Sequence, residues 1–337
     1  MDKKVLQAIK DQVKASHPAV LATIVQVSGS VPRHEGAQML IFSDGRTVGT
    51  IGGGCGEAGV RREALIVLDD GQPRKHRVLL NSDLAADEGM VCGGVMDVFL
   101  EQITQPALYQ EALHYLESMK PAVLVSLMDS TVIKGIYDLQ GTKLAGEDCD
   151  FDMDMLNQVY LRGKACLVKD NKGYPTLYEP ILPEEKLLIL GAGHVGLYVA
   201  EFGAKLDFKV TVVDDRPDFA NRSRFPNADQ ILCTDFGTAI DEFGLDTNTY
   251  IVIVTRGHQY DEICLRKILG RPHKYLGMIG SRRRVKLLLN KLHDEGFALD
   301  DLEKVKTPIG LSIGAETPAE IAISILGEII TRRRLNR

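Results

Sequence analysis

One cysteine lies in a run of glycines, the residues that permit the widest range of backbone conformations. Positions 50–57 read TIGGGCGE, so Cys55 lies among four glycines and a helix-like pattern begins directly after it. A thiolate at a helix N-terminus is stabilised by the oriented N–H groups and by the positive end of the helix dipole. Glycines such as Gly53 and Gly54 let a bulky ligand approach the backbone and leave the sulfur uncovered. The segment therefore predicts a site for a thiolate metal ligand or a nucleophile.

A second glycine-flanked thiol occurs in MVCGG, where Cys92 opens a strand-like segment and gains less from a helix dipole. For Cys55 and Cys92 alike, the competing interpretation is a tight turn that needs a small side chain. The six cysteines of the chain lie far apart, with no CxxC pair and no zinc spacing, which predicts free thiols. The two glycine-flanked cysteines are the candidates for chemistry.

Another set of candidate residues forms a glycine-rich turn. A GxGxxG motif, formed by Gly191, Gly193 and Gly196, directly follows the strand-like LLIL. Asp214 ends the next strand-like segment, VTVVD. The first two glycines permit a pyrophosphate to approach a helix N-terminus, and the third permits close packing of helix on strand. An acidic residue at this distance is placed to accept a hydrogen bond from a ribose hydroxyl. The pattern predicts a Rossmann-type unit, with NAD(H) binding and a purely structural turn as open alternatives.

Polar residues follow further strand-like segments of the same half. TRGHQYDE comes after YIVIV, and IGSRRR comes after KYLGM. Ligands of doubly wound sheets bind beyond the carboxyl ends of the strands, so we expect these loops to border one crevice with the glycine turn. A serine cap followed by arginines can form an anion site, although one such arginine could equally solvate a helix face. The candidates in these loops are Arg256, His258, Ser281 and Arg282, and His194 in the glycine turn is a further candidate.

The motifs fall into three regions of the chain. Strand-like patterns with one helix predict a mixed α+β domain over residues 1–104, and residues 105–183 read as a connecting region of short strands and helices. Residues 184–337 alternate buried strands with amphipathic helices, which is typical of a parallel sheet covered on both faces. The predicted fold class is α/β: an N-terminal mixed α+β domain followed by a C-terminal Rossmann-like doubly wound parallel sheet.

The composition excludes several classes of protein. With 45% apolar and 26% charged residues, the chain of 337 residues resembles an ordinary globular protein of two domains. The formal charge of −6 argues against general nucleic-acid binding, which needs a basic face. No segment has the length and apolarity of a membrane span, and the N-terminal segment lacks the apolar core of a signal peptide. We therefore expect a cytoplasmic protein that binds neither nucleic acid nor membrane.

Eight segments carry a resemblance to a known family. They are GSVPRHEGAQML (29–40), GTIGGGCGE (49–57), MVCGG (90–94), LGAGHVG (190–196), VVDDRPDFANRSRFPNAD (212–229), TRGHQYD (255–261), GMIGSRRR (277–284) and PIGLSIGAETPAEIAISILGEII (308–330). In this order they resemble the XdhC/CoxI family, the accessory proteins of xanthine dehydrogenase and related molybdenum hydroxylases. The segments cover the N-terminal domain and nearly all of the Rossmann half, whereas residues 105–183 add almost nothing to the resemblance.

The resemblance implies a chaperone for the molybdenum cofactor (molybdopterin) rather than a turnover enzyme. Such a protein binds the cofactor, protects it while its terminal sulfur is installed, and hands it to an apo-hydroxylase. Cys55 would then contact molybdenum or its sulfur, with Cys92 as the second candidate. The nucleotide-like end would lie on Gly191, Gly193, Gly196 and Asp214, and a phosphate on Arg282. The implied partners are apo-xanthine dehydrogenase or a related molybdenum hydroxylase, a cysteine desulfurase, and a second copy of the chain in a homodimer.

Two other functions stay open at the level of sequence. A NAD(P)-dependent oxidoreductase would bind its nicotinamide cofactor tightly and would need an acid or base, for which His258 is available. An interaction protein with a vestigial Rossmann turn would bind neither cofactor. Against the oxidoreductase, the chain shows no second motif of a recognised dehydrogenase.

Overall fold

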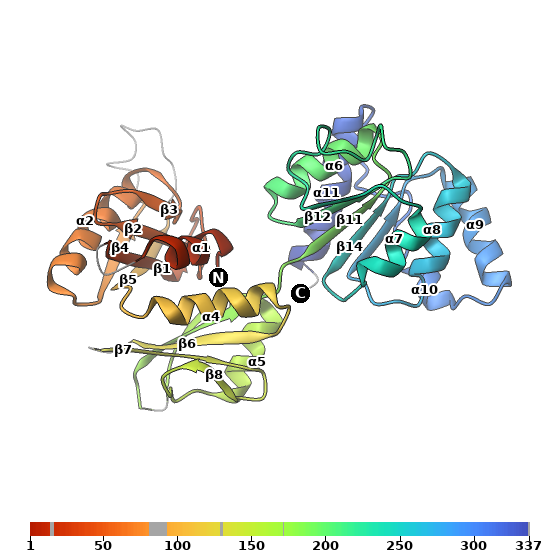
Figure 1. Ribbon diagram of the computed structural model, residues 1–337. Coiled ribbons are helices and arrows are strands. Elements are labelled where there is room, and N and C mark those ends of the chain that lie inside the picture. Colours follow the sequence, from red (N-terminus) through yellow and green to blue (C-terminus); the bar gives the residue numbers. More distant parts are fainter. Residues whose placement is uncertain (14–16, 81–92, 129–130, 171, 336–337) are drawn as a thin grey trace. The chain divides into compact units, whose positions relative to one another are not determined.

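The chain divides into two compact units, Met1–Pro183 and Glu184–Arg337. The computed structural model describes residues 1–13, 17–80, 93–128, 131–170 and 172–335 (Figure 1). Within these ranges the first unit contains two five-stranded antiparallel sheets, and the second contains one five-stranded parallel sheet. The predicted α/β class is therefore confirmed, with a mixed N-terminal part and a Rossmann-like C-terminal part.

The first sheet has the strand order β3-β2-β1-β5-β4. Its strands are β1 (Ala19–Ser28), β2 (Gln38–Phe42), β3 (Thr47–Gly49), β4 (Arg74–Leu79) and β5 (Val95–Gln102). Helix α2 (Gly54–Asp70) covers one face, where its Val60, Ala64 and Val67 join alternate residues of β1 in a buried core. The helix ends at Gly71, which has a φ of 69°, a left-handed conformation that glycine favours.

The second sheet is formed by residues 105–183, for which the sequence predicts only a connecting region of short strands and helices. Its order is β8-β7-β6-β10-β9. The strands are β6 (Ala122–Met128), β7 (Val132–Tyr137), β8 (Lys143–Gly146), β9 (Cys166–Lys169) and β10 (Pro175–Ile181). Helix α5 (Met153–Arg162) packs on one face, whereas α1 (Lys3–Gln12) and α4 (Pro106–Glu117) share a core with both sheets. Residues 105–183 thus form part of the first unit.

The second unit has the strand order β13-β12-β11-β14-β15, and all of these strands are parallel. They are β11 (Lys186–Leu190), β12 (Lys209–Val213), β13 (Gln230–Leu232), β14 (Thr249–Ile253) and β15 (Tyr275–Met278). The helices are α6 (His194–Lys205), α7 (Phe236–Phe243), α8 (His258–Ile268), α9 (Arg282–Asp294), α10 (Leu299–Glu303) and α11 (Pro318–Leu335).

Both faces of this sheet are covered, because alternate strand residues enter two separate cores. Leu187 and Ile189 of β11 pack with residues of α6 and α11, whereas Leu188 and Leu190 pack with residues of α7, α8 and α9. Figure 1 shows the helices in two layers about the strands. In the described part of the chain, every helix is too short or too polar to cross a membrane.

Candidate functional site

The glycine-rich turn joins β11 to α6 at the carboxyl edge of the parallel sheet. Gly191 has a φ of +120°, and a β-carbon there would lie 2.4 Å from the carbonyl oxygen of Val254. A β-carbon on Gly196 would lie 2.1 Å from the carbonyl oxygen of Gly191. At Gly193, by contrast, a β-carbon would meet no atom within 4 Å. The fold itself requires two of these glycines, whereas the space beside the third, Gly193, is open.

Asp214 follows β12 as the sequence predicts, but its carboxylate is already engaged by its own surroundings. Oδ2 accepts a hydrogen bond from the backbone N–H of Ala192 at 2.8 Å. Arg216 donates to both oxygens, with Nε 2.8 Å from Oδ1 and Nη2 3.0 Å from Oδ2. Burial alone would raise the pKa of Asp214, but the hydrogen bonds from Arg216 and Ala192 hold it below its ordinary value. A ribose hydroxyl would have to compete with Arg216 for this carboxylate.

Two arginines lie beside the turn, and Asp214 balances the charge of one of them, Arg216. The guanidinium carbon of Arg216 lies 3.7 Å from the ring centre of Phe219, and that of Arg224 lies 4.7 Å from the same ring centre. Arg224 also donates from Nη1 to the carbonyl oxygen of Ala192 at 2.8 Å. Arginine stacked on an aromatic ring is held in position while its remaining N–H groups can meet an anion. This arrangement suits a phosphate better than a neutral sugar.

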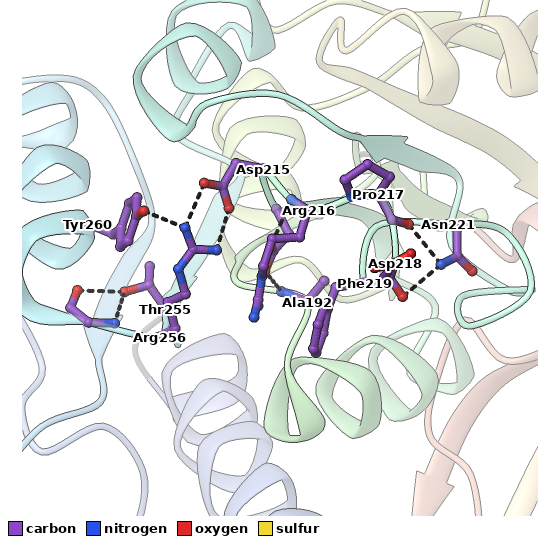
Figure 2. A network of polar contacts seen from close by, with 12 residues as sticks. Ala192, Asp215, Arg216, Pro217, Asp218, Phe219, Asn221, Thr255, Arg256 and Tyr260 are labelled. Carbon is purple, nitrogen blue, oxygen red and sulfur yellow. Dashed lines mark hydrogen bonds and ion pairs between the residues drawn. The ribbon is translucent and has the colours of Figure 1, made fainter.

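The loop after β14 is held by ion pairs to neighbouring loops, as Figure 2 shows for Arg256. Arg256 makes two hydrogen bonds to Asp215, of 2.7 and 2.8 Å, and a third to the hydroxyl of Tyr260. Buried Asp261 accepts from Thr255 at 2.6 Å and from Arg284 at 3.0 Å. Burial raises the pKa of Asp261. These contacts connect the loops after β12 and β14 with the start of α9.

The remaining candidates of this half lie at the same edge of the sheet. His194 and His258 are exposed first residues of α6 and α8. Ser281 accepts from the backbone N–H of Arg284 at 3.4 Å and so caps α9, as the sequence predicts. Arg282 is the first residue of α9, but its side chain lies outside the described part of the structure. A parallel sheet brings all these loops together because its strands end on one side.

In the first unit, the loop before α2 is organised by Glu57, a residue whose role the sequence does not reveal. Oε1 of Glu57 accepts from the hydroxyl of Thr50 at 2.6 Å and from the backbone N–H groups of Gly53 at 3.0 Å and Ile51 at 3.1 Å. Burial alone would raise the pKa of Glu57, but these hydrogen bonds lower it. Gly52, Gly53 and Gly54 all have positive φ. The loop is therefore a fixed turn that needs glycine.

We expect Glu57→Ala to lower the free energy of unfolding by about 1–2 kcal/mol, because two backbone N–H groups lose their acceptor. Chemical denaturation measures this change. Glu63→Ala, on the same helix and 3.9 Å from His76, is the control and should stay within about 0.5 kcal/mol of the wild type. The pKa of Glu57 is lower in the folded protein than in the unfolded chain, where it is about 4.3. Its contribution to the free energy of unfolding is therefore fully present above about pH 4.3 and is lost as the pH falls through the folded pKa. An unchanged difference between wild type and Glu57→Ala across this acid range would contradict the assignment.

The cysteines are only partly described. The backbone of Cys55 lies in the first turn of α2, as expected, but its side chain and the whole of Cys92 lie outside what the structure describes. Among the described cysteines, Cys149 and Cys264 are buried and Cys233 is exposed, and all are free thiols. The described residues contain no group of three or more His, Cys, Asp or Glu side chains that could hold a metal ion.

Two family models match the chain. One is described as the XdhC Rossmann domain and matches residues 187–329, and the other is described as the XdhC and CoxI family and matches residues 12–79. A Bacillus subtilis protein, named as a probable subunit of xanthine dehydrogenase, is 31% identical over 324 residues, which are 94% of each chain. The molybdenum cofactor insertion chaperone PaoD of Escherichia coli is 24% identical over 98% of this chain and 88% of that protein.

Two further comparisons concern length and fold. The uncharacterized protein YqeB of Escherichia coli is 29% identical over 93% of this chain, but this chain spans only 43% of that protein. A crystal structure described as a xanthine dehydrogenase from Bacillus halodurans has a TM-score of 0.82 and 26% identity, and the match covers 100% of this chain and 97% of the other. Both units thus have a counterpart in a solved structure.

Proposed function

This chain belongs to the XdhC and CoxI family, and we propose that it is an accessory factor that binds molybdenum cofactor and inserts it into a molybdenum hydroxylase. The observation that carries the proposal is the match to an insertion chaperone over 98% of this chain and 88% of that protein. The name of the Bacillus subtilis relative supports a xanthine dehydrogenase as the recipient. The cofactor is cargo here, since the chaperone releases it to the enzyme.

The glycine turn supports binding of the anionic end of the cofactor. Molybdopterin ends in a phosphate or a dinucleotide, and a helix N-terminus with free space at Gly193 is suited to such a group. Arg224 adds positive charge beside the turn, whereas the charge of Arg216 is balanced by Asp214. We further propose that Arg282 contacts a phosphate and that His194, His258 and Ser281 border the same ligand.

Cys55, with Cys92 as the second candidate, is proposed to contact molybdenum or its terminal sulfur. A thiolate is a soft ligand, and the backbone of Cys55 lies in the first turn of α2, where the helix dipole favours negative charge. We propose that the cofactor is held in this way while its sulfur is installed. A cysteine desulfurase would then be the sulfur donor, and a homodimer is the proposed assembly.

Reconstitution tests the proposal. The purified chain is loaded with molybdenum cofactor and added to apo-xanthine dehydrogenase, and the recovered hydroxylase activity is compared with that from free cofactor at the same concentration. We expect the loaded chain to activate the enzyme faster and to a higher final level. Equal activation by free cofactor would contradict an insertion role, and a chain that never retains molybdenum would contradict cofactor binding.

An oxidoreductase that uses NAD(P) finds no support in this site. The carboxylate of Asp214, which would accept from the ribose, is engaged by Arg216 and Ala192. Titration with NAD(H) and NADP(H) in the same buffer serves as the comparison, and we expect either nucleotide to bind at least about tenfold more weakly than the molybdenum cofactor.

A further inference from the structure

A cavity of about 270 Å³ opens in the first unit where β5, α4 and β7 meet. This volume is close to the lower end of the roughly 300–1,000 Å³ found for small-molecule sites. The turn after α2 forms one wall, and the end of β5 with the start of α4 forms another. None of its lining residues belongs to the glycine turn or to the loop before α2, so the cavity is separate from the site described above.

Two of the residues that line the cavity form a buried ion pair. Lys134 of β7 and Glu101 of β5 are each 8% exposed, and the ammonium of Lys134 donates to the Glu101 carboxylate. Lys134 also donates to the hydroxyl of Tyr109 on α4 at 2.8 Å. Burial alone would lower the pKa of Lys134, but the neighbouring Glu101 carboxylate raises it, so the ammonium is charged.

Lys134 also balances part of the charge of the buried Glu179 carboxylate, but the fold does not require charged side chains at these positions. Burying two charges costs desolvation free energy that their attraction often fails to offset, and apolar side chains of similar volume commonly stabilise a fold as well or better. The pair also lies on the wall of an open space rather than inside close-packed side chains. Charged groups that are desolvated at the base of a cavity are typical of binding sites.

The polar atoms of these lining residues have hydrogen-bonding capacity left. Within the described ranges, Lys134 uses two of its three N–H donors, and the second oxygen of Glu101 and the hydroxyl proton of Tyr109 have no other partner. These residues of the cavity lining thus retain one acceptor and two donors without a protein partner in the described ranges. Ile103, Leu108 and Val132 supply apolar surface to the same cavity.

We propose that this cavity binds a planar heterocycle with a lactam edge, in which a ring N–H lies beside a C=O group. Glu101 accepts from the ring N–H, and Lys134 or Tyr109 donates to the carbonyl oxygen. The apolar side chains contact the faces of the ring. Oxopurines and pterins both present this edge, and the choice between them is left to the experiment.

Isothermal titration of the full chain with hypoxanthine, with pterin and with adenine tests the proposal. Adenine is a planar ring of the same kind that lacks the carbonyl group. We expect saturable binding of at least one lactam, with adenine weaker by at least about tenfold. Binding by hypoxanthine alone would identify an oxopurine site, and binding by pterin alone a pterin site. No saturable binding of either lactam up to about 1 mM, or equal binding of adenine, would overturn the proposal.

Three variants place the binding in this cavity. Val132→Phe fills the space and is expected to abolish binding, and Tyr109→Phe removes one hydroxyl and is expected to weaken it several-fold. Lys134→Met removes the main donor. This variant leaves Glu101 buried without its partner, so it could fail to fold. In that case Val132→Phe and Tyr109→Phe decide the test. Tyr115→Phe, on the same helix but outside the lining, is the control. Wild-type affinity in both Val132→Phe and Tyr109→Phe would show that the ligand binds elsewhere.

Discussion

Replacing Cys55 by alanine is expected to reduce activation of the apo-hydroxylase by at least about tenfold while leaving the fold intact. The proposed contact with molybdenum or its sulfur depends on the thiolate, which alanine cannot replace. The fold should tolerate the change, since the residue lies in the first turn of α2 and alanine favours helix. The measurements are molybdenum content of the loaded chain and activity recovered by the apo-enzyme.

Cys233→Ala is the matched control for this experiment. Cys233 is an exposed free thiol in the second unit, so its loss removes an accessible sulfur that the proposal does not use. We expect it to load and deliver cofactor like the wild type. If Cys55→Ala also did so, the thiol at position 55 would have no part in holding the cofactor, and Cys92 would become the candidate to test.

The parallel sheet can be predicted from sequence because its strands are continuous apolar runs. KLLIL of β11 and TYIVI of β14 are buried on both faces, and each is followed by a turn and an amphipathic helix. Such local patterns do not depend on distant partners. The glycine turn and the cap of α9 at Ser281 are equally local, since each is specified within a few residues.

The second antiparallel sheet is hard to predict because polar side chains are buried in its strands. Lys134 interrupts β7, and Glu179 interrupts β10. Each is accommodated by a residue far along the chain: Glu101 for Lys134, and Gln38, whose Nε2 donates to Glu179 at 2.9 Å across 141 positions. Sequence periodicity contains no information about such partners. The sequence of residues 105–183 therefore predicts only short, separate elements, although this region forms a complete sheet.

The candidate site shows the same limit at the level of single side chains. The sequence places Asp214 correctly at the end of β12, but whether its carboxylate is free depends on the path of the loop to Arg216. Glu57 is missed for a related reason. It is the fourth residue of α2, one position beyond the usual place of a capping glutamate, and it reaches back to the backbone of Ile51 and Gly53.

Two substitutions in the glycine turn are expected to affect different properties: Gly196→Ala lowers the stability of the fold, and Gly193→Ala weakens ligand binding. Together they separate ligand binding from folding. Gly196→Ala should destabilise the second unit by about 1–3 kcal/mol or more, because its β-carbon would lie 2.1 Å from the carbonyl oxygen of Gly191 and the backbone there must move. Gly193→Ala should leave the free energy of unfolding within about 0.5 kcal/mol of the wild type, since its β-carbon meets no atom within 4 Å and its φ of −69° suits any residue.

The added methyl group at position 193 would nevertheless occupy the space through which, in our proposal, a phosphate of the cofactor reaches the N-terminus of α6. We expect Gly193→Ala to weaken binding of the molybdenum cofactor by at least about tenfold, measured by titration of the folded variant. Chemical denaturation of the same preparation shows that the loss does not come from unfolding. Wild-type affinity in Gly193→Ala would mean that the ligand does not approach the turn at this residue, and the anionic end of the cofactor would then have to bind elsewhere in the chain.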